Sequence, residues 1–115
     1  MYSKRKSASF YLLTEKPILT GAPIDTTWQA GPLKATALWV NVFASDHPIF
    51  YEVTVRLAEG GEGDLIQWQE TANTKVEIIL EADELSGGVT IRFSIRAINF
   101  SGLFTTVSSD LFVAP

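Results

Sequence analysis

Residues 88–102 read Gly-Val-Thr-Ile-Arg-Phe-Ser-Ile-Arg-Ala-Ile-Asn-Phe-Ser-Gly, and this stretch decides the fold class. Successive side chains of a strand point to opposite faces. One parity is apolar and holds Val89, Ile91, Phe93, Ile95 and Ala97. The other parity is polar and holds Thr90, Arg92, Ser94 and Arg96. The pattern predicts a long strand with one face on a packed core and one in water, ending in an Asn-x-Ser-Gly turn.

The remainder of the chain has the same character. Strands are predicted at residues 9–14, 24–29, 34–44, 49–58, 65–69, 74–81 and 103–113. Prolines surround residues 24–29, which therefore belong at a sheet edge because proline cannot donate to a strand ladder. Residues 34–44 form a strong strand, apolar on both parities in its second half. About seven strands at this spacing predict an all-β fold, a seven-stranded antiparallel β-sandwich around one core.

The length of 115 residues predicts a single domain, placed at residues 8–115 after a flexible basic arm at residues 1–7. There is no cysteine, so packing and sheet hydrogen bonds must hold the fold. The N-terminus does not have the pattern of a secretory signal, and no apolar run is long enough to span a membrane. We therefore expect a cytosolic protein, a domain excised from a longer chain, or a protein released by lysis.

From about residue 33 to residue 113 the chain resembles a fibronectin type III domain. The resemblance rests on Trp39 in an early strand, on Phe50-Tyr-Glu-Val-Thr-Val55 and the Glu-Gly-Gly hairpin after it, on residues 74–80 and on residues 92–99. It implies an immunoglobulin-like sandwich in which residues 74–80 are the fifth strand and residues 92–99 belong to the sixth. Ile91 stands where that family usually has a buried tyrosine, and the first thirty residues form an N-terminal extension.

Charge is distributed unevenly along the chain. The net charge is −4, yet Lys4, Arg5 and Lys6 lie together, so residues 7–115 carry six bases against thirteen acids. An acidic body repels phosphate, so nucleic acid is not an expected partner. The basic tripeptide is either a solvated, disordered end or a contact for an acidic neighbour or for nucleic acid.

Catalytic chemistry has little support in the sequence, which predicts no enzyme and no cofactor. The only histidine, His47, lies in a turn before Pro48 and has no nucleophile motif near it, so we expect a solvent-exposed turn residue. Acidic residues cluster at 59–64 and 81–84 without the spacing of a calcium loop, and no metal site is predicted. Asn99-Phe100-Ser101 matches a glycosylation sequon, but we expect its asparagine to bond its own backbone.

Apolar residues on the outward parity give the best indication of function. Phe50, Ile98 and Phe104 should meet at one end of one sheet, because the third, sixth and seventh strands of such a fold are antiparallel neighbours, and Phe100 lies in the intervening turn. Contiguous exposed apolar surface is typical of an interaction site. The alternative is that the N-terminal segment covers these residues through Phe10, Leu12 or Trp28.

We therefore expect a non-catalytic structural or attachment module that binds protein subunits, its own copies among the candidates, and does not insert into a membrane. The favoured context is a tailed-phage virion, in which the chain is a head-decoration, tail or fibre component made in the host cytoplasm. One alternative is an accessory domain excised from a secreted bacterial enzyme or adhesin. Another is a carbohydrate-binding module that stacks sugars on Trp28 or Trp68.

Overall fold

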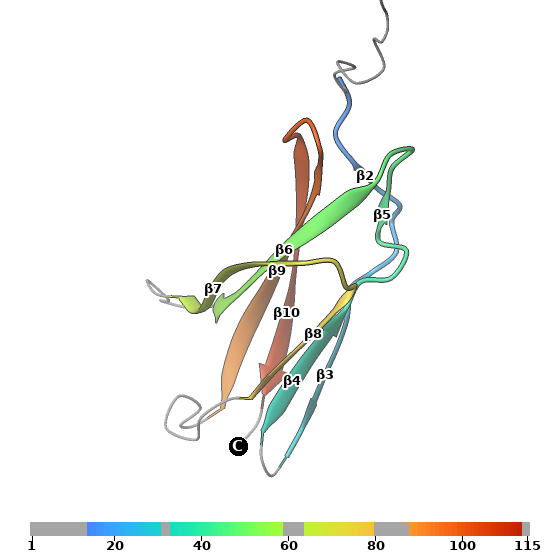
Figure 1. Cartoon of the computed structure of the whole chain (residues 1–115). Helices are drawn as coiled ribbons and strands as arrows, with labels where there is room; N and C mark the ends of the chain where they lie inside the picture. Colours follow the sequence, from blue (N-terminus) through green and yellow to red (C-terminus); the bar gives the residue numbers. More distant parts are fainter. Residues whose placement is uncertain (1–13, 31–32, 59–63, 80–87, 114–115) are drawn as a thin grey trace, which may run out of the picture.

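The computed structural model describes residues 14–30, 33–58, 64–79 and 88–113, and within them the chain is all-β with antiparallel strands in three sheets (Figure 1). A four-stranded sheet has the order β10-β9-β6-β7 and a three-stranded sheet the order β3-β4-β8, while β2 and β5 form a short pair. The strands are β2 (Ile18–Leu19), β3 (Asp25–Gln29), β4 (Lys34–Leu38), β5 (Phe43–Ala44), β6 (Ile49–Leu57), β7 (Asp64–Thr71), β8 (Lys75–Ile79), β9 (Val89–Asn99) and β10 (Phe104–Val113). No helix of the described residues is long and apolar enough to cross a membrane.

The core lies on the inner face of the four-stranded sheet and takes side chains from the three-stranded sheet as well. The strict alternation in β9 is confirmed, because Ile91, Phe93, Ile95 and Ala97 are fully buried. Ile91, Phe93 and Ile95 share one hydrophobic cluster with Val55 of β6 and with buried residues Ala35, Ala37 and Ile78 of β4 and β8. Burial of aliphatic and aromatic side chains, at about 1.5–3 kcal/mol each, is the main stabilising term of such a fold without disulfides.

The single strand predicted at residues 34–44 is wrong in its second half. The chain leaves β4 after Leu38 and turns, with the Val42 amide donating to the Trp39 carbonyl at 3.2 Å, before β5 begins at Phe43. Asn41 has a φ of 66°, a left-handed conformation that asparagine tolerates better than most residues. Apolar residues on both parities therefore mark a buried corner, where Trp39 and Val42 both point into the core.

Apart from β2, which no predicted strand covers, the other described strands follow the sequence prediction closely. β3 is an edge strand, as the surrounding prolines indicated, and β6, β8, β9 and β10 begin and end within two residues of the predicted bounds. Ile91 is buried in the centre of the four-stranded sheet. The predicted strand at residues 9–14 and the loop at residues 81–87 lie outside the described part of the chain, apart from Thr14.

Asn99 ties the end of β9 to two other segments. Its side-chain oxygen accepts hydrogen bonds from the amides of Ser101 and Leu103, at 3.0 and 3.2 Å, so the expected turn chemistry is present. Its side-chain nitrogen donates to the carbonyl of Glu15 at 2.9 Å, 84 residues earlier in the chain. Asn99 is only 2% exposed, so the sequon asparagine is occupied by structural bonds.

The Asn99→Ala substitution should lower the free energy of unfolding by about 2–4 kcal/mol, because it removes three part-buried hydrogen bonds of a side chain that lies in the protein interior. Urea denaturation followed by tryptophan fluorescence measures the change. Asn73→Ala, at an exposed asparagine in the β7–β8 turn, is the control and should change the value by less than about 0.5 kcal/mol. Equal effects of the two substitutions would contradict the role given to the Asn99 side chain.

Tyr51 makes the stability of the fold depend on pH in the alkaline range. Its ring packs against Trp39 at a centroid distance of 5.8 Å and against Phe43 at 6.0 Å, and burial raises the pKa of its phenol. The unfolded chain therefore loses this proton first, and the contribution to stability is present below about pH 10 and is lost above it. Between pH 9 and pH 11 the Tyr51→Phe variant should lose less stability than the wild type, as measured by urea midpoints. An equal loss of stability in both proteins would show that ionisation of the Tyr51 phenol does not contribute to the pH dependence.

Candidate interaction surface on the four-stranded sheet

The outer face of the four-stranded sheet brings together the apolar residues singled out in the sequence. In the strand register Phe50 of β6 is opposite Ile98 of β9, and Ile98 is opposite Phe104 of β10. Phe100 lies in the turn that joins β9 to β10. We call Phe50, Ile98, Phe100 and Phe104 the outer patch. Their use as an interaction site stays a prediction.

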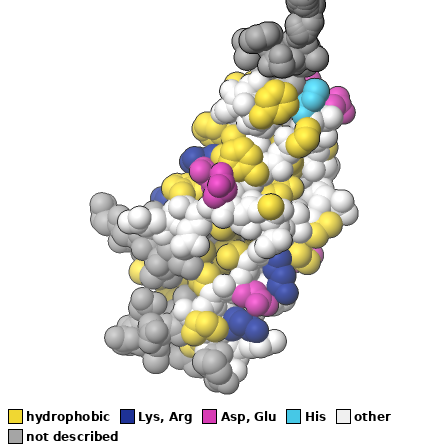
Figure 2. Space-filling view, in the orientation of Figure 1, with side chains coloured by type: hydrophobic (Ala, Val, Ile, Leu, Met, Phe, Trp, Pro, Cys, Tyr) yellow, Lys and Arg dark blue, Asp and Glu magenta, His cyan; other side chains and the backbone are white. Residues whose placement is uncertain are grey.

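The four residues of the outer patch are not equally accessible. Phe100 is 63% exposed and Phe104 is 47% exposed, whereas Phe50 and Ile98 are half-buried. His47 also contacts the patch, because its ring lies edge-on to the ring of Phe100 at 6.1 Å between centroids. His47 is half-buried, which corrects the expectation of a solvent-exposed turn residue. Figure 2 shows hydrophobic side chains beside the histidine near the upper end of one face of the molecule.

Arg96 connects the outer patch to the polar part of the same face. Its guanidinium carbon lies 4.0 Å from the centroid of the Trp68 ring and 4.7 Å from that of Phe104. Its Nη1 donates to Glu52 Oε1 at 3.0 Å, and both side chains of this ion pair are less than a third exposed. A cation over an aromatic ring is stabilised by the ring quadrupole. Arg96 therefore holds two aromatic rings from the two edge strands on one platform.

The described N-terminal segment lies on the opposite face from the outer patch. The side chain of Asn99, which holds the carbonyl of Glu15, is on the buried parity of β9. Thr105, whose hydroxyl donates to the carbonyl of Pro17, is opposite buried Ala97 and so shares that inner parity. Residues 14–19 thus close the core at the end of the β9–β10 hairpin and leave the outer patch uncovered. Phe10 and Leu12, together with Lys4, Arg5 and Lys6, lie outside the described residues.

The two tryptophans named as sugar platforms differ in their surroundings. Trp28 lies in β3 and packs, half-buried, against the hydrophobic core, so it does not cover the outer patch. Trp68 lies in the edge strand β7, but Arg96 occupies one face of its ring. A sugar stacking on that face would have to displace a charged side chain that also pairs with Glu52.

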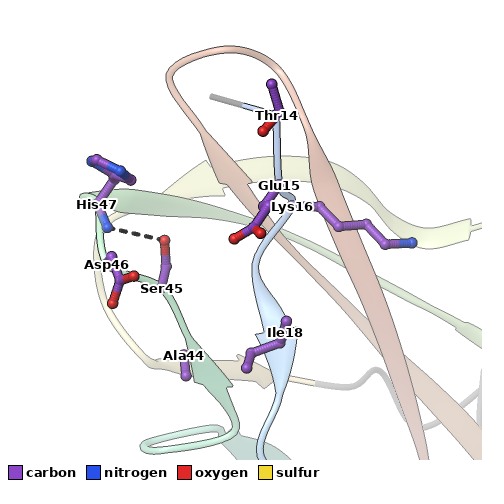
Figure 3. A pocket seen from close by; sticks show the side chains of 8 residues that line it. All are labelled: Thr14, Glu15, Lys16, Ile18, Ala44, Ser45, Asp46 and His47. Carbon is purple, nitrogen blue, oxygen red and sulfur yellow. Dashed lines mark hydrogen bonds between the residues drawn. The ribbon is translucent and has the colours of Figure 1, made fainter. Parts of the chain in front are cut away.

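A polar cleft of about 350 Å3 separates the N-terminal segment from the turn after β5 (Figure 3). Glu15, Asp46 and His47 line it, together with Thr14, Lys16, Ile18, Ala44 and Ser45. The backbone amide of His47 donates to the hydroxyl of Ser45 at 3.2 Å, which fixes the turn. Lys16 extends away from the other side chains in Figure 3. Among the described residues no group of three or more His, Asp or Glu side chains is placed to hold a metal ion.

The acidic cluster at residues 81–84 lies outside the described part of the chain, as does all of the cluster at 59–64 except the strand residue Asp64. Comparison of the chain with protein-family models, with curated proteins and with solved structures found no match. Function is therefore inferred from the geometry of this surface.

Replacing Arg96 by Lys should destabilise the platform, because Lys keeps the charge but loses the planar guanidinium that stacks on the rings. We expect a loss of about 1 kcal/mol in the free energy of unfolding and a change in the near-ultraviolet circular dichroism of tryptophan. The control is Arg92→Lys, in an ion pair with Asp110 whose side chains are 43% and 48% exposed, which should cost less than about 0.5 kcal/mol. An unchanged tryptophan signal for Arg96→Lys would show that the stack does not persist in solution.

Proposed function

We propose that this chain is a non-catalytic structural or attachment module of a larger assembly, with a tailed-phage virion as the favoured setting. The observation that carries the proposal is the outer patch, in which two exposed phenylalanines extend a half-buried apolar row at one end of a sheet. Soluble monomers seldom keep such clusters in water, and aromatic residues dominate the energy of protein interfaces.

The same end of the molecule offers a second contact. Glu15 is held beside the β9–β10 turn by Asn99, so the chain that precedes Thr14 joins the described structure at the end of the molecule that carries the outer patch. We propose that this preceding arm, with Lys4, Arg5 and Lys6, and the outer patch bind neighbouring subunits together. Burial of the two exposed phenylalanines would supply apolar contact, and the basic residues would favour an acidic neighbour.

The finer fold that we propose is a sandwich of the fibronectin type III kind. Numbered along the chain, the seven strands of five or more residues in the described part form one sheet of the first, second and fifth strands and another of the seventh, sixth, third and fourth. Each sheet contributes buried residues to one cluster. Small domains of this architecture are used as head-decoration, tail or fibre components of phages, which is the fold analogy behind the virion setting.

The test is incorporation into particles that are produced with the genes flanking this one. Sedimented particles should contain the chain, and Phe100→Asp should reduce its amount at least tenfold, since it places a charge in the proposed interface. Ile79→Asp is the matched control, because Ile79 is 60% exposed against 63% for Phe100 and lies in β8 of the other sheet. Normal incorporation of the Phe100→Asp protein would refute the patch.

The rival setting, an accessory domain of a secreted protein, makes a different prediction for the same sample. Flanking genes would then encode no particle, and added polysaccharide would shift the tryptophan fluorescence if Trp68 or Trp28 were a sugar platform. A saturable shift in the wild type that is lost in Trp68→Ala would support the carbohydrate module over the assembly module.

A further inference from the structure

The free edge of β10 differs from the other sheet edges of the described residues. β10 is ten residues long and pairs with β9 in one continuous register without a shift. The opposite edge strand, β7, pairs with β6 through two register shifts. The edge strands of the other sheet, β3 and β8, have five residues each, and β8 carries Lys75 and Glu77. A long regular edge is a template for pairing with another strand.

The hydrogen-bond pattern of the β9–β10 hairpin shows which residues face this edge. The Asn99 amide donates to the Leu103 carbonyl at 3.0 Å, so Asn99 and Leu103 form a hydrogen-bonded pair. In an antiparallel ladder such pairs alternate with non-hydrogen-bonded pairs. The odd-numbered residues of β10 therefore bond to β9, and the even-numbered residues direct their amide and carbonyl groups to the free edge. These are Phe104, Thr106, Ser108, Asp110 and Phe112, and all five are exposed.

The side chains along this edge do little to prevent pairing. Natural edge strands are usually protected by lysine, proline or a bulge. β10 has the sequence FTTVSSDLFV, with neither lysine nor proline. Its one charged side chain, Asp110, accepts a hydrogen bond from Nε of Arg92 at 2.9 Å, so an arginine of the same sheet balances its charge. Phe104 and Phe112 are 47% and 61% exposed near the two ends of the strand.

We propose that a second copy of this chain pairs with the free edge of β10, antiparallel and about a two-fold axis at Ser108. The axis places Ser108 opposite Ser108 of the second copy and Thr106 opposite its Asp110. It also places Phe104 opposite Phe112 of the second copy, and the reverse pair forms by symmetry. All of these are even-numbered residues, so each brings an amide and a carbonyl to the new ladder. The two four-stranded sheets become one continuous sheet.

The position of the axis follows from the pattern of side chains. An axis at Val107 also pairs even-numbered residues, but it places Phe104 opposite Asp110 of the second copy and leaves Phe112 without a partner. An axis at Ser109 pairs Phe112 with Thr106 and leaves Phe104 without one. Only the axis at Ser108 forms two aromatic cross-strand pairs, which are favourable in sheets. The two-fold symmetry is the one most common among homodimers.

This dimer goes beyond the proposed function, and it concerns a surface that the outer patch shares only through Phe104. The first experiment uses single cysteines, because the natural chain has none. In a hydrogen-bonded antiparallel pair the two Cα atoms are about 5.5 Å apart, a distance that a disulfide spans. Ser108→Cys should therefore give a disulfide-linked dimer as the main product of mild oxidation.

Thr106→Cys is the matched control, because the two copies of residue 106 would lie four residues apart along the strands, or about 14 Å. It should give less than a tenth of the dimer formed by Ser108→Cys at the same protein concentration. Equal cross-linking at both positions, or none at Ser108, would overturn the proposed register. Sedimentation of the unmodified full chain should show a reversible dimer, and a monomer at every soluble concentration would overturn the proposal.

A charge variant separates this dimer from the contacts of the outer patch. Ser108→Lys places two like charges opposite each other at the axis and should weaken dimerisation at least tenfold. Thr27→Lys adds the same charge at an exposed position of β3 and should leave dimerisation unchanged. Phe100→Asp should also leave it unchanged, since Phe100 lies outside β10, so loss of particle binding and loss of the dimer report on different surfaces. A dimer that persists in Ser108→Lys would refute the edge contact.

Discussion

The buried side-chain amide of Asn99 fixes the end of the molecule that carries the outer patch. Its oxygen organises the β9–β10 turn, and its nitrogen holds the carbonyl of Glu15. Leaving a buried side-chain amide without hydrogen-bond partners costs more free energy than its hydrogen bonds contribute net to stability. The β9–β10 turn and the N-terminal segment are therefore ordered together. Because Asn99 is on the inner parity of β9, the segment it holds closes the core. The outer face of the same hairpin is not covered by the described N-terminal residues.

The outer face changes in character along the strands. In the first half of β9 the outer face carries polar pairs: Arg92 is paired with Asp110, and the Ser94 hydroxyl lies 2.8 Å from that of Ser108. Ser94 is almost fully buried, so even the polar parity of this central strand is not all in water. Arg96 then lies between the rings of Trp68 and Phe104, and beyond it the face is apolar. The charged stack thus separates a mainly polar part of the sheet face, which also exposes Phe112, from the part that we propose as an interface.

The two surfaces of assembly that we propose meet at β10. Its outward side chains begin in the outer patch with Phe104, and no strand of the described residues is hydrogen-bonded to its second backbone edge. The outer patch uses side-chain contacts, which are specific to a partner's shape, whereas a strand edge uses backbone hydrogen bonds, which any compatible strand can make. A module with both could pair with its own copy through the edge and bind a different subunit through the patch.

The alternation in residues 88–102 predicted the antiparallel all-β class and the buried parity of β9. It also predicted that the polar outward parity is interrupted at Ile98. With the strand order it also predicted the row of Phe50, Ile98 and Phe104, because a period of two assigns each strand residue to a face. It did not predict the Trp68–Arg96–Phe104 stack, the half-buried His47 or the turn at Asn41. These three features depend on contacts between segments that are distant in sequence. The alternation within one strand contains no information about such contacts.

What the sequence determined by itself is therefore local: most of the strands, which side chains within a strand point the same way, and the turn at Asn99. Only the tertiary structure decided that the N-terminal segment packs on the inner face, that the outer patch stays uncovered by the described residues and that β10 has a free edge. Each of these depends on which strand lies beside which. That choice is set by burial of the whole core, in which Ile91, Phe93 and Ile95 meet side chains from β4, β6 and β8.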